Sequence, residues 1–306
     1  MKKPLLLAVQ GPTASGKTRI AIELAKHFKT VIISCDSRQF FTELKIGAAP
    51  PSSVELAEVT HYFIQHLSIN DDYNAGAFER DALMKLEELF KTHEIVIMVG
   101  GSGLYADAVL KGFDDLPKAD AALRASLQQK LETKGIESLQ NDLRQKDLVY
   151  FQKVDKDNAH RLIRALEVIE QTGKPYSEMR SNVKSNRHFH SINLVMDLPR
   201  DILYERINNR VDAMMALGLE AEARDLLKYR SVQALNTVGY KELFAYFDGE
   251  LELPEAISLI KQNTRRFAKR QLTWLRRDKN AIWISPDNID EMKSLVEERM
   301  KSNFEE

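Results

Sequence analysis

Three short apolar runs mark the first hundred residues, and turn-forming residues bound each of them. They cover Leu5–Val9, Val31–Ser34 and Ile95–Val99. Continuous apolar runs of this length are typical of strands that are buried on both faces of a parallel sheet. The segments between the runs have the length and the polar-apolar spacing of helices. We therefore predict an α/β fold with a central parallel sheet.

A fourth apolar run, Ile192–Met196, follows only after a long stretch rich in Leu, Gln, Glu and Lys at helical spacing. This order predicts a helical insertion domain at residues 118–186, which divides a core formed by residues 1–117 and 187–306. Beyond the fourth run the pattern is almost entirely helical. The tail from Asp287 alternates charged and apolar residues, and we expect it to be a solvated terminal helix.

A phosphate-binding loop follows the first apolar run. The eight residues Gly11, Pro12, Thr13, Ala14, Ser15, Gly16, Lys17 and Thr18 fit the P-loop pattern, and a predicted helix, Arg19–Phe28, comes next. Glycines let the backbone N–H groups turn inward around an anion, and the helix N-terminus adds its positive dipole. Lys17 supplies a mobile charge, and the Thr18 hydroxyl is a candidate Mg²⁺ ligand. The pattern predicts a diphosphate or triphosphate ligand, as in ATP-binding proteins, without specifying a nucleotide.

A carboxylate follows the second run rather than the third. Ile95–Val99 leads into Gly100-Gly101-Ser102-Gly103, where an ordinary ATPase would carry an aspartate for Mg²⁺. Val31–Ser34 leads into Asp36. Because the carboxyl ends of parallel strands meet at one edge of a sheet, we expect Asp36 to lie beside the P-loop. From the residues alone it could be a metal ligand, a general base or a helix N-cap.

Composition excludes several classes of protein. The 306 residues carry a net charge of −1, so the chain as a whole does not attract polyanions. The single cysteine, Cys35, excludes an internal disulfide and multi-cysteine metal sites, and it favours a reducing, cytoplasmic location. No apolar run approaches the ~18 residues of a membrane span. We expect a monomer without membrane contact.

Positive charge is concentrated near the C-terminus. Residues 261–279 contain one acid, Asp278, and eight basic residues: Lys261, Arg265, Arg266, Lys269, Arg270, Arg276, Arg277 and Lys279. On a helix, Arg265, Lys269 and Arg276 align, and so do Arg266, Arg270 and Arg277. Ile260, Phe267 and Trp274 fall on another face, which is predicted to pack. The basic face is either solvated or a track for an RNA phosphate backbone.

Several blocks of sequence, in order, resemble the tRNA dimethylallyltransferase family in its bacterial form. They are Gly11–Thr18, Ile33–Gln39, Val99–Tyr105, Arg161–Val168 with Thr172–Lys174, Val238–Glu242 and Lys269–Arg276, and the similarity covers about residues 4–278. The resemblance implies that the P-loop binds the diphosphate of dimethylallyl diphosphate together with Mg²⁺. It also implies that the acceptor is N6 of the adenosine 3′-adjacent to the anticodon of tRNA. That base would have to be extruded from its stack to react.

The resemblance further implies roles for individual residues. The catalytic residues would be Asp36, as general base, with Thr13 and Lys17. The diphosphate site would consist of residues 11–18. Independently of the resemblance, Arg206 and Arg210 share a predicted helix face, where they either clamp a diphosphate or lie on the surface, and we favour Arg210 as facing the diphosphate. The tRNA contacts would be Asp36, Ser37, Arg38, Gln39, Ser102, His160, Arg161, Leu162, Ile163, Arg164, Arg265 and Arg266. Ala48, Pro50, Phe41 and Tyr62 depart from the family's usual residues.

Other functions fit part of this pattern. A small-molecule P-loop kinase would share the Lys17–Thr18 pair, and it would label a product with the γ-phosphate of ATP. A transferase acting on free AMP would use the P-loop and Asp36 but would not need the basic segment. A non-enzymatic RNA-binding switch would use the P-loop as a sensor without turnover.

Overall fold

The computed structural model describes residues 3–114, 116–180 and 186–302. They separate into two compact units, one formed by residues 1–110 with 187–306 and the other by residues 111–186. The insertion predicted at 118–186 falls within the second unit.

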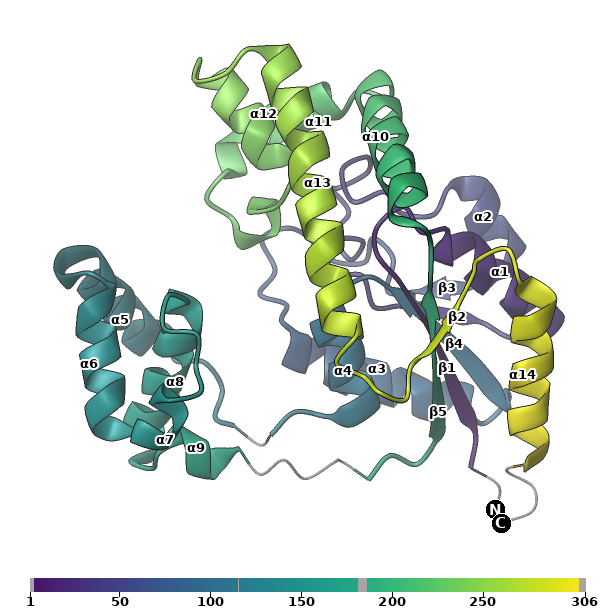
Figure 1. The fold of residues 1–306 in the computed structure, drawn as a ribbon, viewed down its shortest axis with the longest axis horizontal. Helices are drawn as coiled ribbons and strands as arrows, with labels where there is room; N and C mark the ends of the chain where they lie inside the picture. The colour runs from purple at the N-terminus through teal and green to yellow at the C-terminus, as the bar shows by residue number, and fades with distance from the viewer. Residues whose placement is uncertain (1–2, 115, 181–185, 303–306) are drawn as a thin grey trace. The chain divides into compact units, whose positions relative to one another are not determined.

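The first unit is built on a six-stranded sheet in which every pairing is parallel, in the order β3-β2-β4-β1-β5-β6 (Figure 1). The strands are β1 (Leu5–Gln10), β2 (Ile32–Ser34), β3 (His61–Tyr62), β4 (Ile95–Gly100), β5 (His190–Met196) and β6 (Ile282–Ile284). The predicted α/β fold with a central parallel sheet is confirmed. The short strands β3 and β6 were not predicted, because two or three residues carry too little periodicity to be recognised.

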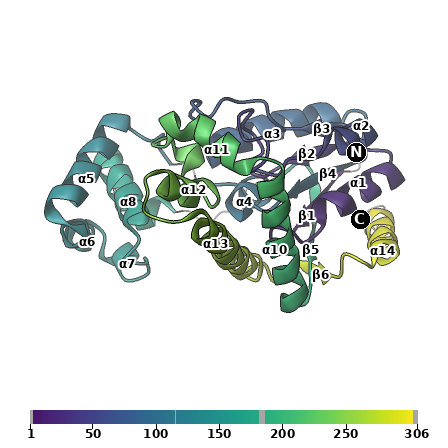
Figure 2. The same ribbon diagram turned by 90° about the horizontal axis from the view of Figure 1, so that it is seen from above.

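Helices cover both faces of this sheet, because successive residues of a strand point to opposite sides. Leu5, Leu7 and Val9 of β1 pack with helices α1 (Lys17–His27) and α14 (Ile289–Ser302). Leu6 and Ala8 pack on the other face with α3 (Ala75–Leu89) and α4 (Gly103–Lys111). Figure 2 shows α1 and α14 side by side against the sheet.

The terminal helix therefore belongs to the core. The expected terminal helix is present, but Met292 and Val296 of α14 are fully buried, so the expectation that it is solvated was wrong for this face. Charged residues occupy most of the exposed positions of α14, and they masked an apolar stripe that recurs at helical spacing.

A helical layer stands at the carboxyl edge of the sheet. It contains α10 (Arg200–Ala216), α11 (Leu219–Leu226), the 3₁₀ turns η1 (Leu227–Tyr229) and η2 (Gln233–Leu235), α12 (Tyr240–Phe247) and α13 (Leu253–Leu275). Its own apolar cluster includes Val211, Leu235, Tyr240 and Ile260, and Leu44 from the loop after β2 packs into it. The short helix α2 (Ser53–Glu58) lies between β2 and β3 in the chain. Helix α13 ends at Leu275 with Arg276 as its cap residue, so Arg276 and Arg277 stand at the end of the basic helix rather than within it.

The second unit is entirely helical within the described residues. It comprises α5 (Ala121–Lys134), α6 (Ile136–Lys146), α7 (Leu148–Phe151), α8 (Ala159–Thr172) and α9 (Tyr176–Met179), with a core of its own. Glu167 of α8 is fully buried in this unit. Its carboxylate accepts hydrogen bonds from the Arg124 and Arg164 guanidinium groups, at 2.9 and 2.8 Å, and from the Asp120 backbone N–H at 2.9 Å. A buried carboxylate is tolerated because these donors replace water.

Candidate active site

Three loops meet at the carboxyl edge of the sheet because β2, β4 and β1 are neighbours. The P-loop follows β1, the Asp36 loop follows β2, and a glycine-rich turn follows β4. Parallel strands bring such loops to one edge, where α/β proteins place their ligand sites. The predicted proximity of Asp36 and the P-loop is therefore present in the fold.

The P-loop adopts the conformation that an anion site requires. Ala14 and Gly16 have positive φ values of 64° and 87°, and α1 begins immediately afterwards at Lys17. The first N–H groups of a helix have no partner within it, so those of α1 can turn toward an anion. The Ser15 hydroxyl is buried and has no hydrogen-bond partner in the described part of the chain. A buried polar atom of this kind fits a ligand oxygen.

The Lys17 ammonium lies inside the loop that precedes it. Its Nζ is 3.4 Å from the Pro12 carbonyl oxygen. Burial lowers the pKa of Lys17 to about 8, while the negative charge of Asp36 opposes this shift and Arg210 adds to it. Lys17, Asp36 and Arg210 therefore interact electrostatically across one site.

Hydrogen bonds hold the Asp36 loop against the glycine-rich turn. The Asp36 Oδ1 accepts from the Arg38 backbone N–H at 3.1 Å. The Ser37 backbone N–H donates to the Ser102 Oγ at 3.0 Å, and the two serine hydroxyls are 3.1 Å apart. The Arg38 guanidinium donates to the Ala234 carbonyl at 2.9 Å. Asp36 is therefore a carboxylate on a fixed loop rather than a helix N-cap.

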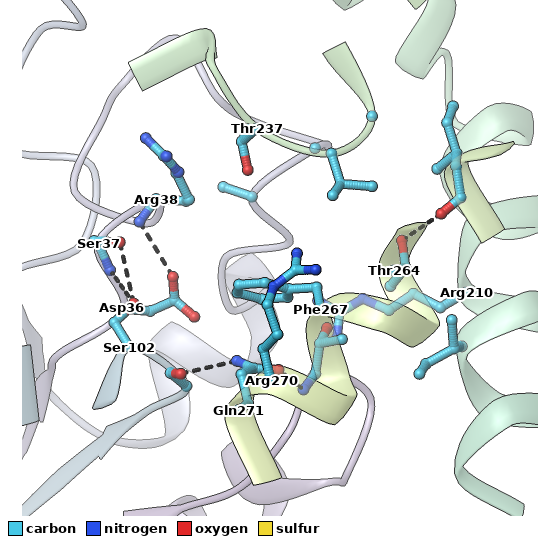
Figure 3. A pocket seen from close by; sticks show the side chains of 18 of the residues that line it. Asp36, Ser37, Arg38, Ser102, Arg210, Thr237, Thr264, Phe267, Arg270 and Gln271 are labelled. Carbon is cyan, nitrogen blue, oxygen red and sulfur yellow. Dashed lines mark hydrogen bonds between the residues drawn. The ribbon is translucent and has the colours of Figure 1, made fainter. Parts of the chain in front are cut away.

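A cavity of about 380 Å³ opens between these loops and helices α10 and α13 (Figure 3). Its polar wall contains Thr13, Asp36, Ser102 and Arg210. Its apolar wall is formed by Ile207, Val211, Met214, Leu219, Ile260 and Phe267. A site with a few convergent polar groups and an apolar wall suits a ligand that carries a charged group on a hydrocarbon or aromatic body.

Helix α13 contributes cavity residues that the sequence did not identify. Phe267 was predicted to pack in the interior, but it is 39% exposed and lines the cavity, so that prediction was wrong. Trp274 does pack: its ring lies over Gly103, where a Cβ would be 2.3 Å from the indole, and its Nε1–H donates to Asp107 Oδ2 at 2.8 Å. The glycines at 101 and 103 were the one signal that another element approaches this turn closely.

Three comparisons bear on this site. The family model described as IPP transferase matches residues 39–278. The tRNA dimethylallyltransferase of Christiangramia forsetii is 53% identical over 282 residues, covering 92% of this chain and 93% of the relative. That of Flavobacterium johnsoniae is 48% identical over 306 residues, covering 98% and 99%. The chain belongs to the tRNA dimethylallyltransferase family.

The solved structures agree with this assignment. The tRNA isopentenylpyrophosphate transferase of Bacillus halodurans is 32% identical, with a TM-score of 0.74 and 99% of both chains covered. The resemblance drawn from the motif blocks is thus confirmed, and with it the class of enzyme, a transferase. Among the described residues, none of the helices combines the length and the apolar character needed to cross a membrane.

The tRNA contacts suggested by membership of the tRNA dimethylallyltransferase family divide into two groups. Ser37, Arg38 and Ser102 line the cavity with Asp36, whereas the Gln39 side chain is buried. Gln39 Oε1 accepts from the Ser34 hydroxyl at 3.1 Å, and its Nε2 donates to the Ala49 carbonyl at 3.0 Å. Gln39 thus supports the loop from inside, and both ends of its amide have partners within the protein.

The block that begins at His160 lies on α8. His160 and Arg161 are exposed, whereas Leu162 and Ile163 are buried in the core of the second unit. Their predicted contact with tRNA was wrong for the side chains, because apolar periodicity turns them inward. Arg164 donates to the Pro117 carbonyl at 2.7 Å as well as to Glu167, so its guanidinium holds the unit together.

The basic residues of α13 are not equivalent. Arg266 and Lys269 are exposed on the surface of the helix, and Arg270 is exposed and lines the cavity. Arg265 is partly buried, and its Nη1 donates to Asn208 Oδ1 at 2.6 Å. Arg210, from α10, lines the cavity, and burial lowers the pKa of its guanidinium while Asp36 opposes the shift.

Proposed function

We propose that this enzyme transfers the dimethylallyl group of dimethylallyl diphosphate to N6 of the adenosine 3′-adjacent to the anticodon of tRNA. The observation that carries the proposal is the shared cavity, in which the Asp36 carboxylate and Thr13 of the P-loop line the same wall. One group is suited to receive a proton and the other belongs to a loop suited to hold a diphosphate.

The P-loop is the proposed site of the leaving group. Residues 11–18 would enclose the diphosphate, with the N–H groups at the start of α1 turned toward it, and Lys17 and Arg210 would offset its charge as the bond between C1 and oxygen breaks. The Thr13 side chain, on the cavity wall, would lie beside the oxygen that departs. The apolar wall around Ile207, Met214 and Phe267 would hold the five-carbon chain away from water.

Asp36 is the proposed general base. The N6 lone pair forms the new bond to C1, the diphosphate leaves with the electrons of the broken C–O bond, and the extra proton on N6 passes to the Asp36 carboxylate. Only one of its oxygens, Oδ1, accepts the hydrogen bond from Arg38. A positioned base is typically worth about 10²–10⁴ in rate.

Mg²⁺ fits the residues present. Within the described residues no group of three His, Cys, Asp or Glu side chains could hold a metal ion. Thr18, in the first turn of α1, would supply one hydroxyl ligand, and Mg²⁺ commonly completes its shell with substrate phosphates and water. When bound, it would neutralise charge on the departing diphosphate.

RNA would be held by basic side chains outside the cavity. Arg266 and Lys269 are exposed on α13, and His160 and Arg161 are exposed on α8. Arg270 is also exposed, but it lines the cavity. Arg265 would act through its contact with Asn208 rather than as a free cation. Contacts to phosphates position an RNA without reading its bases. We also propose that the enzyme works as a monomer in the cytoplasm, a reducing compartment that suits its single cysteine, Cys35.

The test is direct. Purified protein is incubated with dimethylallyl diphosphate, Mg²⁺ and unmodified tRNA, and the nucleosides are analysed by mass spectrometry after digestion. We expect one adenosine per acceptor tRNA to gain a dimethylallyl group. Parallel incubations offer AMP as acceptor or γ-labelled ATP as donor. Transfer to AMP with none to tRNA, or label from ATP on a product, would replace the proposal with one of the other functions.

A further inference from the structure

Gln271 of α13 connects two of the loops that build the cavity. It lies 258 residues from Thr13 and 170 from Gly101 along the chain, yet it contacts both. Its Oε1 accepts a hydrogen bond from the Thr13 backbone N–H at 2.9 Å, and its Nε2 donates to the Gly101 carbonyl at 2.8 Å. The side chain is only 8% exposed, so water competes little with either bond.

The chemistry of the two partners dictates which way the amide points. A backbone N–H can only donate, and a carbonyl oxygen can only accept, so oxygen must face Thr13 and nitrogen must face Gly101. The neutral amide of glutamine offers an acceptor and a donor on the same planar group, and so it meets both partners. A carboxylate would set a negative oxygen against the Gly101 carbonyl, and a thioether would offer Thr13 almost nothing.

The neighbouring turn is shaped to admit this side chain. A Cβ on Gly101 would come within 2.5 Å of Gln271 Nε2, within 3.4 Å of the Gly11 carbonyl oxygen and within 3.6 Å of Lys17 Nζ. No larger residue fits there without displacing the amide. Gly101 therefore brings the glutamine, the P-loop backbone and the Lys17 ammonium together.

Ser102 connects the two hydrogen bonds of Gln271 to the Asp36 loop. Ser102 follows Gly101, and its Oγ accepts from the Ser37 backbone N–H at 3.0 Å, directly after Asp36. Gln271 thus links the P-loop to the turn that holds the Asp36 loop. It also occupies the Thr13 N–H, so that Thr13 offers the cavity its side chain rather than its backbone. Figure 3 shows Gln271 near Ser102 and the Asp36 loop.

We propose that Gln271 is a positioning residue that sets the separation between the diphosphate and the base. Gln271 acts through Thr13 and through the turn at Gly101 and Ser102. The identity of the two substrates in this proposal rests on the proposed function. Displacement of reacting groups by about 1 Å can cost ~10²-fold in rate even when binding survives. The glutamine should therefore contribute to turnover more than to affinity.

Two variants remove the link in different ways. Gln271→Met keeps the length of the side chain and removes both hydrogen bonds. Gln271→Glu keeps an acceptor for Thr13 and makes the contact with Gly101 repulsive. Gln262→Met is the matched control, because Gln262 is exposed on the same helix and lies outside the cavity lining. Steady-state kinetics vary each substrate in turn, and thermal unfolding is measured for every variant.

Both Gln271 variants should lose about 10- to 100-fold in kcat. The KM for tRNA should stay within about twofold of the parent, as expected for a lost transition-state interaction. Their unfolding temperatures should remain near that of Gln262→Met. Parental kcat in either variant would overturn the proposal. So would equal rises in both KM values together with a marked fall in unfolding temperature, since that pattern indicates general damage. A parent enzyme that transfers nothing to tRNA would instead refute the proposed function.

Discussion

The Tyr240 hydroxyl donates a hydrogen bond of 2.7 Å to the Glu222 carboxylate, which also accepts from three consecutive backbone N–H groups. The three donors are Lys45, Ile46 and Gly47, at 2.8 to 2.9 Å. Tyr240 is fully buried, and burial together with Glu222 raises the pKa of its hydroxyl, which therefore remains a donor. Gly47 lines the cavity, so this pair of side chains supports part of its wall.

Tyr240→Phe should lower the free energy of unfolding. The change removes the donor and leaves the Glu222 oxygen with one partner fewer, which typically costs about 1–3 kcal/mol. Urea unfolding followed by circular dichroism measures the difference. Tyr229→Phe is a suitable control because Tyr229 is only partly buried at the edge of the same cluster. Equal stability of the Tyr240 variant and the parent would show that the hydrogen bond is not needed to hold the loop.

Asp36→Asn should abolish most of the transfer and leave tRNA binding largely intact. The amide has nearly the shape of the carboxylate but cannot take the N6 proton, so we expect kcat to fall by about 10²–10⁴. Single-turnover assays with saturating substrates give the rate, and filter binding gives the affinity for tRNA. A variant that prenylates tRNA at the parental rate would remove Asp36 from the role of base.

The affinity for dimethylallyl diphosphate should decline as the pH rises above about 8. Burial holds the pKa of Lys17 near 8, against 10.5 for the unperturbed side chain, so the ammonium is lost through this range in the free enzyme. Diphosphate favours the charged form, and below pH 8 that form is already present. Titration calorimetry from pH 6.5 to 9.5 measures the trend.

Lys17→Arg provides the control for this pH effect, because a guanidinium stays charged throughout. The ratio of parental to variant affinity cancels any ionisation of the ligand. A ratio that does not change with pH would show that Lys17 keeps its proton without the ligand.

The lowered pKa of Lys17 also affects the free energy of unfolding of the enzyme without ligand. The ammonium is favoured more in the unfolded chain than in the folded one, so the unfolded state binds more protons between pH 8 and 10.5. The contribution of Lys17 to the free energy of unfolding is therefore least favourable below about pH 8 and improves as the pH rises toward 10.5.

Arg266→Glu should weaken tRNA binding in a salt-dependent way. Removing one phosphate contact reduces the slope of log affinity against log salt by roughly 0.7–0.9. Filter binding over a series of KCl concentrations determines this slope. Lys91→Glu is the control, since Lys91 is exposed and precedes β4 at the opposite edge of the sheet. An unchanged slope for Arg266→Glu would place the RNA on another surface.

The fold class and the P-loop could be predicted from the sequence because both depend on local patterns. The consecutive residues of Leu5–Val9 predict a buried strand, and those of the loop after it match the P-loop pattern. Phe267 shows the limit of this reasoning. Helical spacing places it on the same face as Ile260 and Trp274, but spacing cannot tell whether that face meets protein or an open cavity.

Family resemblance introduced a different error at Leu162 and Ile163. The block around them was assigned to tRNA as a whole, although local periodicity alone would have turned these two side chains inward. Neither sequence periodicity nor family resemblance identified Gln271. A buried amide has no hydrophobic signature, and its partners are distant in the chain, so only the folded structure brings them together.

The position of α13 in the chain has a consequence for biosynthesis. The P-loop and Asp36 leave the ribosome long before Phe267, Gln271 and Trp274 do. A nascent chain that has completed most of its sheet still lacks one wall of the cavity and the amide that joins its loops. Competence for transfer therefore arises only after α13 has been translated, and a fragment released before that point would carry the P-loop without a complete cavity.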